Sequence, residues 1–254
     1  MKRNTFVLFC SARTGSYSLV SRLDSARDIL CHGEIFKPNR LEVEEFYKSK
    51  MKINSIKERD EKPLTYINAL RILNPHCHFG FKLFNSHLSR LKKIGEYLMH
   101  PDTKRIVLVR DYQEVYCSLM RAKASGIWVR KITSPKKNEC TAIHMDTETP
   151  VAFFDEESFS SFSHHYSHFI AKAHDLKAMK NTFVIHYNQI NNEHVINALF
   201  DFLGSKTSFA DTASLYMKQA ASVRDNIANW DIFQEYIETI DVSGFVLPNP
   251  TISF

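Results

Sequence analysis

Short apolar runs that alternate with longer helical patterns constrain the fold of this chain more than any other feature. Residues 6–10, 79–84, 106–109 and 183–186 are rich in β-branched or aromatic side chains, and each run is too short for a helix. These four runs predict buried strands. A fifth, weaker strand is predicted over residues 29–36.

Helical periodicity lies between the predicted strands. The predicted helices cover residues 16–26, 87–99, 113–124, 158–179 and 193–203. Gly204 follows the last of them as a C-terminal cap. Strands that alternate with helices predict a three-layer α/β sandwich, with a central parallel sheet of about five strands and helices on both faces. We expect one domain over residues 1–254, with a lid or long excursion at about 129–157, where the periodicity is lost.

The composition fits a globular domain and a negatively charged ligand. Hydrophobic residues make up 44% of the 254 residues and charged residues 24%, which excludes disordered and fibrous chains. The 33 basic and 28 acidic residues give a formal net charge of +5. This mild excess favours an anionic ligand but is too small for a nucleic-acid groove, so we expect no nucleic acid among the partners.

The cysteines and the apolar runs bear on the cellular compartment. Five cysteines without a C-x-x-C pair predict reduced thiols, as in the cytoplasm, rather than a disulfide framework. No apolar run approaches the roughly 18 residues that a membrane span needs, and no signal-peptide core follows the basic N-terminus. The sequence therefore predicts a cytoplasmic protein with no transmembrane segment.

A loop with the features of an anion site follows the first predicted strand. Ligands of open parallel sheets bind at the carboxyl ends of the strands, where helix N-termini point. Arg13, Thr14, Gly15 and Ser16 stand at this place and open a helix, so they offer free backbone N–H groups, a cation and two hydroxyls. The loop lacks the Lys of a Walker A motif. An ordinary capped turn is the alternative interpretation.

Three further strand-end positions carry candidate chemistry. Arg110 ends one strand and Ser118 lies two turns into the next helix, so together they can clamp a phosphate; a surface Arg and a solvated Ser are the alternative. Glu34 follows the weak strand among apolar residues, as a general base with a tuned pKa would, or as a carboxylate bonded to a turn. Lys82 stands inside a buried strand, where a cation needs an anion unless it reaches solvent from an edge.

Taken together, these positions resemble the sulfotransferases that use 3′-phosphoadenosine 5′-phosphosulfate (PAPS). The segment from Arg13 to Ser16 resembles their 5′-phosphosulfate loop, and Arg110 with Ser118 has the spacing of their 3′-phosphate motif. The Cys-His-Gly-Glu-Ile-Phe segment around Glu34 resembles the segment in which carbohydrate and tyrosyl-protein sulfotransferases carry their catalytic Glu. Residues 106–110 and 118–128 look closest to the bacterial glycan group, such as the trehalose and Nod-factor enzymes. The fold implied is P-loop-like.

The resemblance also assigns roles to the candidate residues. Glu34 is implied as the base that takes the acceptor proton, while Arg13, Lys82 and the loop N–H groups neutralise charge on the sulfuryl oxygens and the leaving phosphate. Arg110 and Ser118 are implied to hold the 3′-phosphate. His32 is the fallback base, two residues from Glu34 and on the same strand face if the segment is extended.

The donor site implied by the resemblance extends to three more positions. Tyr187 resembles the Tyr that lies by the adenine, after the strand of residues 183–186. Residues 222–230 are similar in placement to the segment that closes over the nucleotide, and Arg224 in it is expected to add a second cation. Tyr17 stands where the family usually has a small residue, so its side chain is expected to turn away from the phosphosulfate.

The partners expected from the sequence are the PAPS co-substrate and a hydroxyl-bearing acceptor, a glycan or a glycolipid. No metal is expected, because His164 and His168 are spaced four apart but lack an H-E-x-x-H pattern or completing ligands. The sequence leaves a homodimer open. Two alternatives also stay open: a nucleotide or metabolite kinase of similar architecture, which would need the P-loop Lys, and a non-catalytic nucleotide-binding relative.

Overall fold

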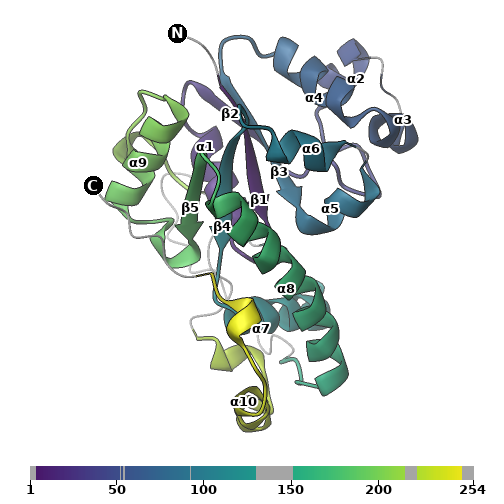
Figure 1. The fold of residues 1–254 in the computed structure, drawn as a ribbon, viewed down its shortest axis with the longest axis vertical. Coiled ribbons are helices and arrows are strands. Elements are labelled where there is room, and N and C mark those ends of the chain that lie inside the picture. The colour runs from purple at the N-terminus through teal and green to yellow at the C-terminus, as the bar shows by residue number, and fades with distance from the viewer. Residues whose placement is uncertain are drawn as a thin grey trace, which may run out of the picture.

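The computed structural model describes residues 4–51, 53, 55–91, 93–129, 151–214 and 222–247. Its centre is a sheet of five parallel strands in the order β2-β3-β1-β4-β5 (Figure 1). The strands are β1 (Thr5–Cys10), β2 (Ile29–His32), β3 (His78–Phe84), β4 (Lys104–Val109) and β5 (Thr182–His186). This confirms the predicted P-loop-like α/β sandwich with a central five-stranded parallel sheet.

Apolar side chains on both faces of the strands explain why helices cover both faces of the sheet. In β1, Val7 and Phe9 enter one core, while Phe6, Leu8 and Cys10 enter the other, and all five are fully buried. Strands that are apolar on both faces are typical of parallel sheets, because helices cover each face. The continuous apolar runs of the sequence therefore predicted the layered fold.

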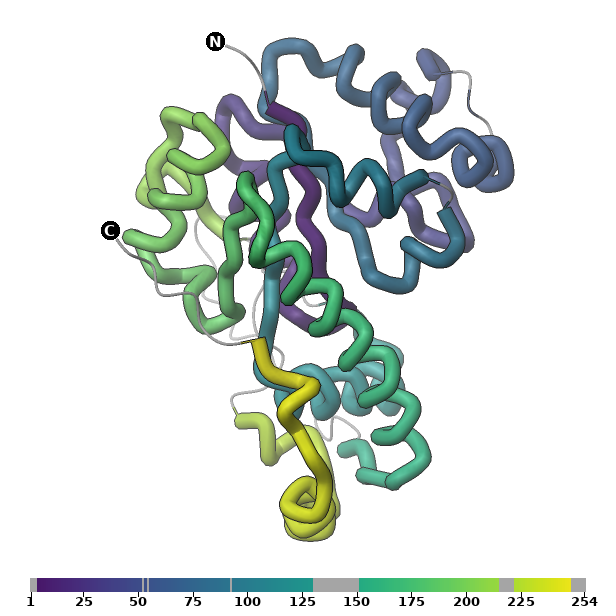
Figure 2. The backbone as a smooth tube through the Cα atoms, viewed as in Figure 1, coloured from purple at the N-terminus to yellow at the C-terminus, as the bar shows by residue number. Residues whose placement is uncertain are grey.

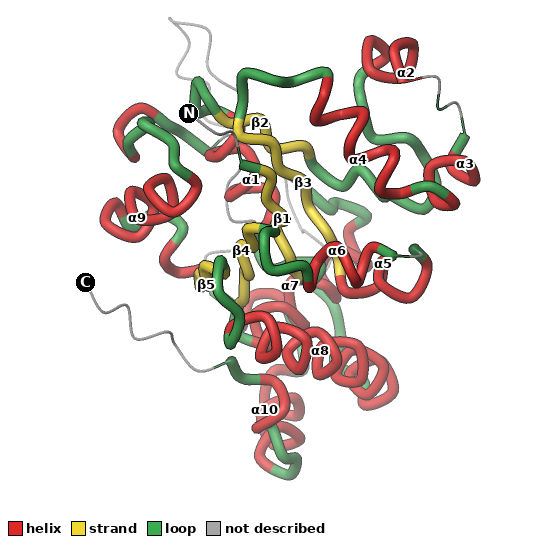
Figure 3. The backbone as a smooth tube through the Cα atoms, turned by 45° about the horizontal axis from the view of Figure 1, so that its top comes forward, coloured by secondary structure: helices red, strands yellow, loops and turns green. Residues whose placement is uncertain are grey.

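Two sets of helices form the outer layers (Figure 3). On one face, α1 (Ser16–Asp24) and α9 (Glu193–Leu203) bury apolar side chains against the sheet. The other face packs against α4 (Pro63–Ile72), α6 (Ile94–Met99), α7 (Tyr112–Ser125) and α8 (Glu156–Lys177). The helix predicted over residues 193–203 matches α9, which ends at Gly204 with a φ of 81°.

Two predicted elements differ from the structure. The single helix predicted over residues 87–99 is wrong: α5 (Asn85–Arg90) ends where Leu91 turns extended, and α6 starts after Lys93, whose φ is 65°. A left-handed residue cannot continue a right-handed helix. The weak fifth strand is real but short, because β2 ends at His32 rather than at residue 36.

Four short helices were not predicted from periodicity. They are α2 (Glu45–Met51), α3 (Ile56–Glu61), α4 and α10 (Trp230–Glu238). Two of them carry local signals that periodicity ignores: Ser55 caps α3 by accepting a hydrogen bond from the Glu58 N–H at 3.1 Å, and Pro63 is the first residue of α4.

The C-terminal part of the chain runs alongside α8 (Figure 2). The 3₁₀ turn Ser243–Phe245 packs against α8, and Ala152 forms a parallel bridge with Ile227. The predicted excursion at 129–157 is therefore anchored at its end, where Asp155 caps α8 through the Ser158 N–H at 2.8 Å. Residues 130–150 lie outside the described residues, so the lid stays a prediction. None of the helices in the described ranges is long and apolar enough to cross a membrane.

The strand order places a crevice between β1 and β4. The connection that leaves β1 runs through α1 to β2 on one side, and the connection that leaves β4 leads to β5 on the other. Loops that diverge from adjacent parallel strands open a binding crevice at their carboxyl ends. The loops after β1 and β4 are those that begin with Ser11 and Arg110.

Candidate active site

The loop after β1 has a conformation that exposes its backbone and depends on Gly15. Arg13 and Gly15 both adopt left-handed conformations, with φ of 67° and 87°. A Cβ on Gly15 would lie 2.3 Å from two ring carbons of Tyr187, so the ring packs directly on the glycine backbone. Thr14 is fully buried and donates to the Ser11 carbonyl at 2.8 Å, which closes the turn before α1 begins at Ser16. Gly15 is needed for both its φ and its missing side chain.

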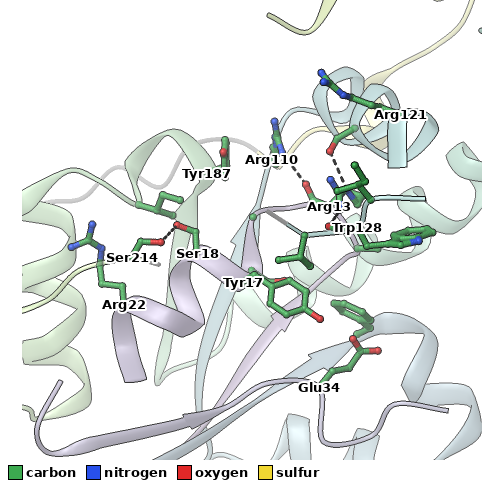
Figure 4. Close-up of a pocket in the computed structure, with 18 of the residues that line it drawn as sticks. Arg13, Tyr17, Ser18, Arg22, Glu34, Arg110, Arg121, Trp128, Tyr187 and Ser214 are labelled. Atoms are coloured by element: carbon green, nitrogen blue, oxygen red, sulfur yellow. Dashed lines mark hydrogen bonds between the residues drawn. The ribbon is translucent and has the colours of Figure 1, made fainter. Parts of the chain in front are cut away.

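The structure brings Ser118 together with Arg13 and Arg110 across the crevice. Arg13 and Arg110 are labelled in Figure 4. Arg13 Nε donates to Ser118 Oγ at 3.0 Å, and Arg110 Nη1 donates to the Arg13 carbonyl at 3.0 Å. The Arg110 guanidinium lies 4.0 Å from the centre of the Tyr187 ring and donates to Glu114 Oε2 at 2.6 Å. Residues from three strand ends therefore converge on one point.

The electrostatics of this point favour an anion. Burial lowers the pKa of the Arg13 guanidinium, and the charge of Arg110 lowers it further. The two guanidinium groups repel each other, and the Glu114 carboxylate can offset only one of the two positive charges. A phosphate or sulfate group meets both through charge-assisted hydrogen bonds.

Glu34 lies just beyond β2 and is held by a lysine and a histidine. Its Oε2 is 3.6 Å from Lys82 Nζ and its Oε1 is 3.6 Å from His87 Nε2. His87 Nδ1 accepts a hydrogen bond from the Phe84 N–H at 3.2 Å, so in the neutral ring the proton is on Nε2 and faces the carboxylate. Both carboxylate oxygens thus have a partner.

The surroundings of Glu34 keep it ionised. Burial raises the pKa of the Glu34 carboxyl, but the hydrogen bond from His87 and the charges of Lys82, His87 and Lys37 outweigh it and bring the pKa below its usual value. A carboxylate that is charged at neutral pH can accept a proton. Asp111, the other carboxylate after a strand, caps α7 by accepting from the Glu114 N–H at 3.0 Å.

Lys82 is fully buried behind two aromatic rings. Its Nζ lies 4.0 Å from the centre of the Tyr17 ring and 4.8 Å from that of Phe84, and it makes an ion pair with Glu34 but no hydrogen bond. Tyr17 and Phe84 line the cavity described below, whereas Lys82 does not. In this arrangement Lys82 acts on Glu34 rather than on the cavity.

A cavity of about 1440 Å³ joins these parts (Figure 4). Its described lining has six cationic side chains, from Arg13, Arg22, Lys37, Arg40, Arg110 and Arg121. Glu34 is the one carboxylate among those lining residues. A concave, cation-rich site at the carboxyl ends of parallel strands fits a polyanionic ligand.

A model of the sulfotransferase domain family matches residues 76–234, well over half of the chain. The chain belongs to the sulfotransferase family. The matched range includes Lys82, Arg110, Ser118 and Tyr187, and it begins after the Arg13 loop and after Glu34. Family membership supports sulfuryl transfer as the reaction. No curated protein matches the chain.

Several solved sulfotransferase structures resemble the chain at low identity. A sulfotransferase from Alicyclobacillus acidocaldarius has 16% identity and a TM-score of 0.49 over 96% of this chain and 95% of that one. Mouse sulfotransferase SULT7A1 in complex with PAP has 12% identity and a TM-score of 0.48 over 90% and 72%. The sulfotransferase domain of the curacin biosynthetic pathway has 14% identity and 0.48 over 99% and 95%. At these TM-scores the likenesses say nothing about what this chain binds.

Four of the site residues that the sequence predicted do not line the cavity: Thr14, Lys82, His32 and Arg224. Thr14 is buried between two chain neighbours that line the cavity, and Lys82 is buried against the lining rings of Tyr17 and Phe84. His32 contacts the rings of Tyr47 and Phe79, and burial lowers its pKa to about 4. The shared strand face of His32 and Glu34 was expected only if the segment is extended, and β2 ends at His32. The side chain of Arg224 is 69% exposed, with Nη2 3.9 Å from Asp231.

Three arginines of the cavity, at positions 22, 40 and 121, were missed from the sequence, and two of them lie on helices. Arg121 lies one turn after Ser118 on α7, and its Nη1 donates to Asn226 Oδ1 at 3.0 Å. Arg22 lies on α1, stacks at 4.4 Å on the Phe209 ring and donates to Asn191 Oδ1 at 3.1 Å. Each is on a helix that starts at the crevice, at helical spacing from a lining serine. That spacing is the signal that could have found them.

Proposed function

We propose that this sulfotransferase moves a sulfuryl group from PAPS to a hydroxyl of a carbohydrate or glycolipid acceptor. The observation that carries the proposal is the cavity with six cationic side chains and one carboxylate, at the carboxyl ends of a parallel sheet. The cations suit the phosphates and sulfate of the donor. The carboxylate suits the removal of the acceptor proton.

The donor end of the cavity consists of the Arg13–Ser16 loop, Arg110, Ser118 and Tyr187. The loop N–H groups and Arg13 would hold the 5′-phosphosulfate, since backbone donors at a helix N-terminus bind anions. Arg110 and Ser118 would hold the 3′-phosphate, which distinguishes PAPS from ATP. The Tyr187 ring, packed on Gly15 and against the Arg110 guanidinium, offers an aromatic face to the adenine.

The Glu34 end of the cavity would carry out the proton transfer. Sulfuryl transfer forms a bond from the acceptor oxygen to sulfur and breaks the bond from sulfur to the phosphate oxygen of the donor. Glu34 would take the proton that the acceptor hydroxyl loses. Lys82 and His87 keep Glu34 ionised beforehand, and Arg13 would balance the charge on the leaving phosphate.

An acceptor with both an apolar face and hydroxyl groups fits the rim near Glu34. Ile127 and Trp128 line the cavity with 42% and 50% of their surface exposed, while Lys37, Asn39 and Arg40 add polar groups. Arg13 Nη1 donates to the Trp128 carbonyl, so this wall is tied to the donor end. A sugar ring can stack on an indole and direct its hydroxyls to polar side chains.

A thermal-shift comparison separates this proposal from its alternatives. Adenosine 3′,5′-bisphosphate (PAP) should stabilise the protein, whereas ATP with magnesium should do so far less. Stabilisation by ATP with magnesium alone would instead indicate a kinase. Labelled-sulfate transfer from PAPS to glycans, glycolipids, phenols and peptides then identifies the acceptor. Binding of PAP without transfer to any acceptor would favour a non-catalytic relative.

A further inference from the structure

The loop over residues 33–40 carries the base but has no regular secondary structure. Within the loop, the Ile35 N–H donates to the Gly33 carbonyl at 3.0 Å and the Lys37 N–H to the Glu34 carbonyl at 3.0 Å. The Lys82 N–H also donates to the Gly33 carbonyl, at 3.1 Å. These three bonds are accepted by Gly33 and Glu34, so the carbonyl groups further along the loop take their donors from elsewhere.

Two arginines from other helices hold the carbonyl groups of this loop. Arg59 of α3 donates through Nη1 to the Ile35 carbonyl at 3.0 Å and to the Arg40 carbonyl at 3.1 Å. Arg90 of α5 donates through Nη2 to the Phe36 carbonyl. The two arginines therefore grip the loop at three points.

Asp60 joins the two arginines into one network. Its Oδ1 accepts from Arg59 Nε at 2.8 Å, and its Oδ2 pairs with Arg90 Nη1. Arg59 is fully buried, and a buried guanidinium is costly unless it is paired and hydrogen-bonded. The same helix α5 carries His87, which contacts Glu34 itself. Side chains of α3 and α5 thus hold both the loop and its carboxylate.

We infer that Arg59, Asp60 and Arg90 are positioning residues that hold the loop so that Glu34 meets the acceptor hydroxyl. The inference rests on the proposed function, because it takes Glu34 as the base. A displacement of about 1 Å at a reacting group costs about 10²-fold in rate. Loss of the network should therefore lower the rate of transfer without changing the donor end.

Arg90→Gln is the variant that tests the network with least risk to folding, because the Arg90 side chain is 30% exposed. Asp60→Asn is the second variant, and Arg71→Gln, an exposed arginine of α4, is the matched control. We expect Arg90→Gln and Asp60→Asn to lower kcat at least about tenfold. PAP affinity should stay within about threefold, and the control should resemble the wild type. A conservative Arg90→Lys should recover part of the rate.

The pH profile separates positioning from a merely structural role. The charged groups around Glu34 are Lys82, His87, Lys37, Arg40 and Glu42, and the buried thiol of Cys10 is also within reach of its charge. A displaced loop weakens the contacts with Lys82 and His87, so the pKa of Glu34 should rise and the acid limb of kcat/KM should move to higher pH. A variant that only lowers the melting temperature would leave that limb in place, which would contradict the inference.

Hydrogen exchange tests the network without relying on turnover. In Arg90→Gln, amide exchange over residues 33–41 should become about tenfold faster, while exchange in β1 stays the same. Unchanged exchange in that loop, together with an unchanged acid limb, would overturn the inference. A wild-type protein that transfers sulfate to no acceptor would contradict the proposed function instead, and the exchange result would still decide whether the network holds the loop.

Discussion

The donor end of the cavity is built from backbone that directly follows the strands, whereas the Glu34 end depends on side chains from distant helices. At the donor end, Gly15 and the N-terminus of α1 shape the loop, and Arg110 donates to the Arg13 carbonyl. At the other end, Glu34 is placed by contacts with α5, β3 and, through its loop, α3. A site can thus have one half that local sequence specifies and one half that only the tertiary fold assembles.

The largest effect is expected from removal of the proposed base, Glu34. Glu34→Gln keeps the shape of the side chain but removes its charge, so kcat should fall by a factor of about 10² to 10⁴. PAP affinity should stay within about threefold, because the donor end is built separately. Steady-state kinetics and calorimetry check the two quantities. Near-normal turnover in Glu34→Gln with a collapse in His32→Ala would transfer the role to His32.

The next effect concerns the donor end alone. Arg110→Ala should weaken PAP binding by about 2–3 kcal/mol, or about 30- to 150-fold, the scale of lost charge-assisted hydrogen bonds. A ligand without the 3′-phosphate should lose far less, which titration calorimetry with adenosine 5′-phosphosulfate would measure. Equal losses of affinity for both ligands would show that Arg110 does not bind the 3′-phosphate.

A smaller effect should separate two candidate cations. Arg121 lines the cavity and is held by Asn226, whereas the side chain of Arg224 is mostly exposed. Arg121→Ala should weaken PAP binding about five- to tenfold, as expected for one partly solvated contact, and Arg224→Ala should change it less than twofold. If Arg224→Ala instead weakened PAP binding more than Arg121→Ala, Arg224 would be the additional cation at the nucleotide, as the resemblance implies.

This difference also explains what the sequence predicted. The strands, α9 and the donor loop were predictable because periodicity and a strand-end glycine are local signals. Arg59 and Arg90 gave no such signal, because their contacts to the Glu34 loop span 24 and 54 residues. Glu34, the proposed base, was a candidate from its place after β2, but its partner His87 is the first residue of a stretch that the sequence presents as one helix.

The smallest effect is expected from removal of the contact between Glu34 and His87 of α5. His87→Leu removes the hydrogen bond that most lowers the pKa of the Glu34 carboxyl. That pKa should therefore rise, and because the base is active only above its pKa, activity should be lost at a higher pH than in the wild type. At neutral pH kcat should fall only a few-fold, since Lys82 still pairs with the carboxylate. His87→Gln retains an N–H donor and should bring the acid limb back towards the wild-type position. If both variants keep the wild-type acid limb, His87 serves only to cap α5 through the Phe84 N–H, and Lys82 and Lys37 keep Glu34 ionised without it.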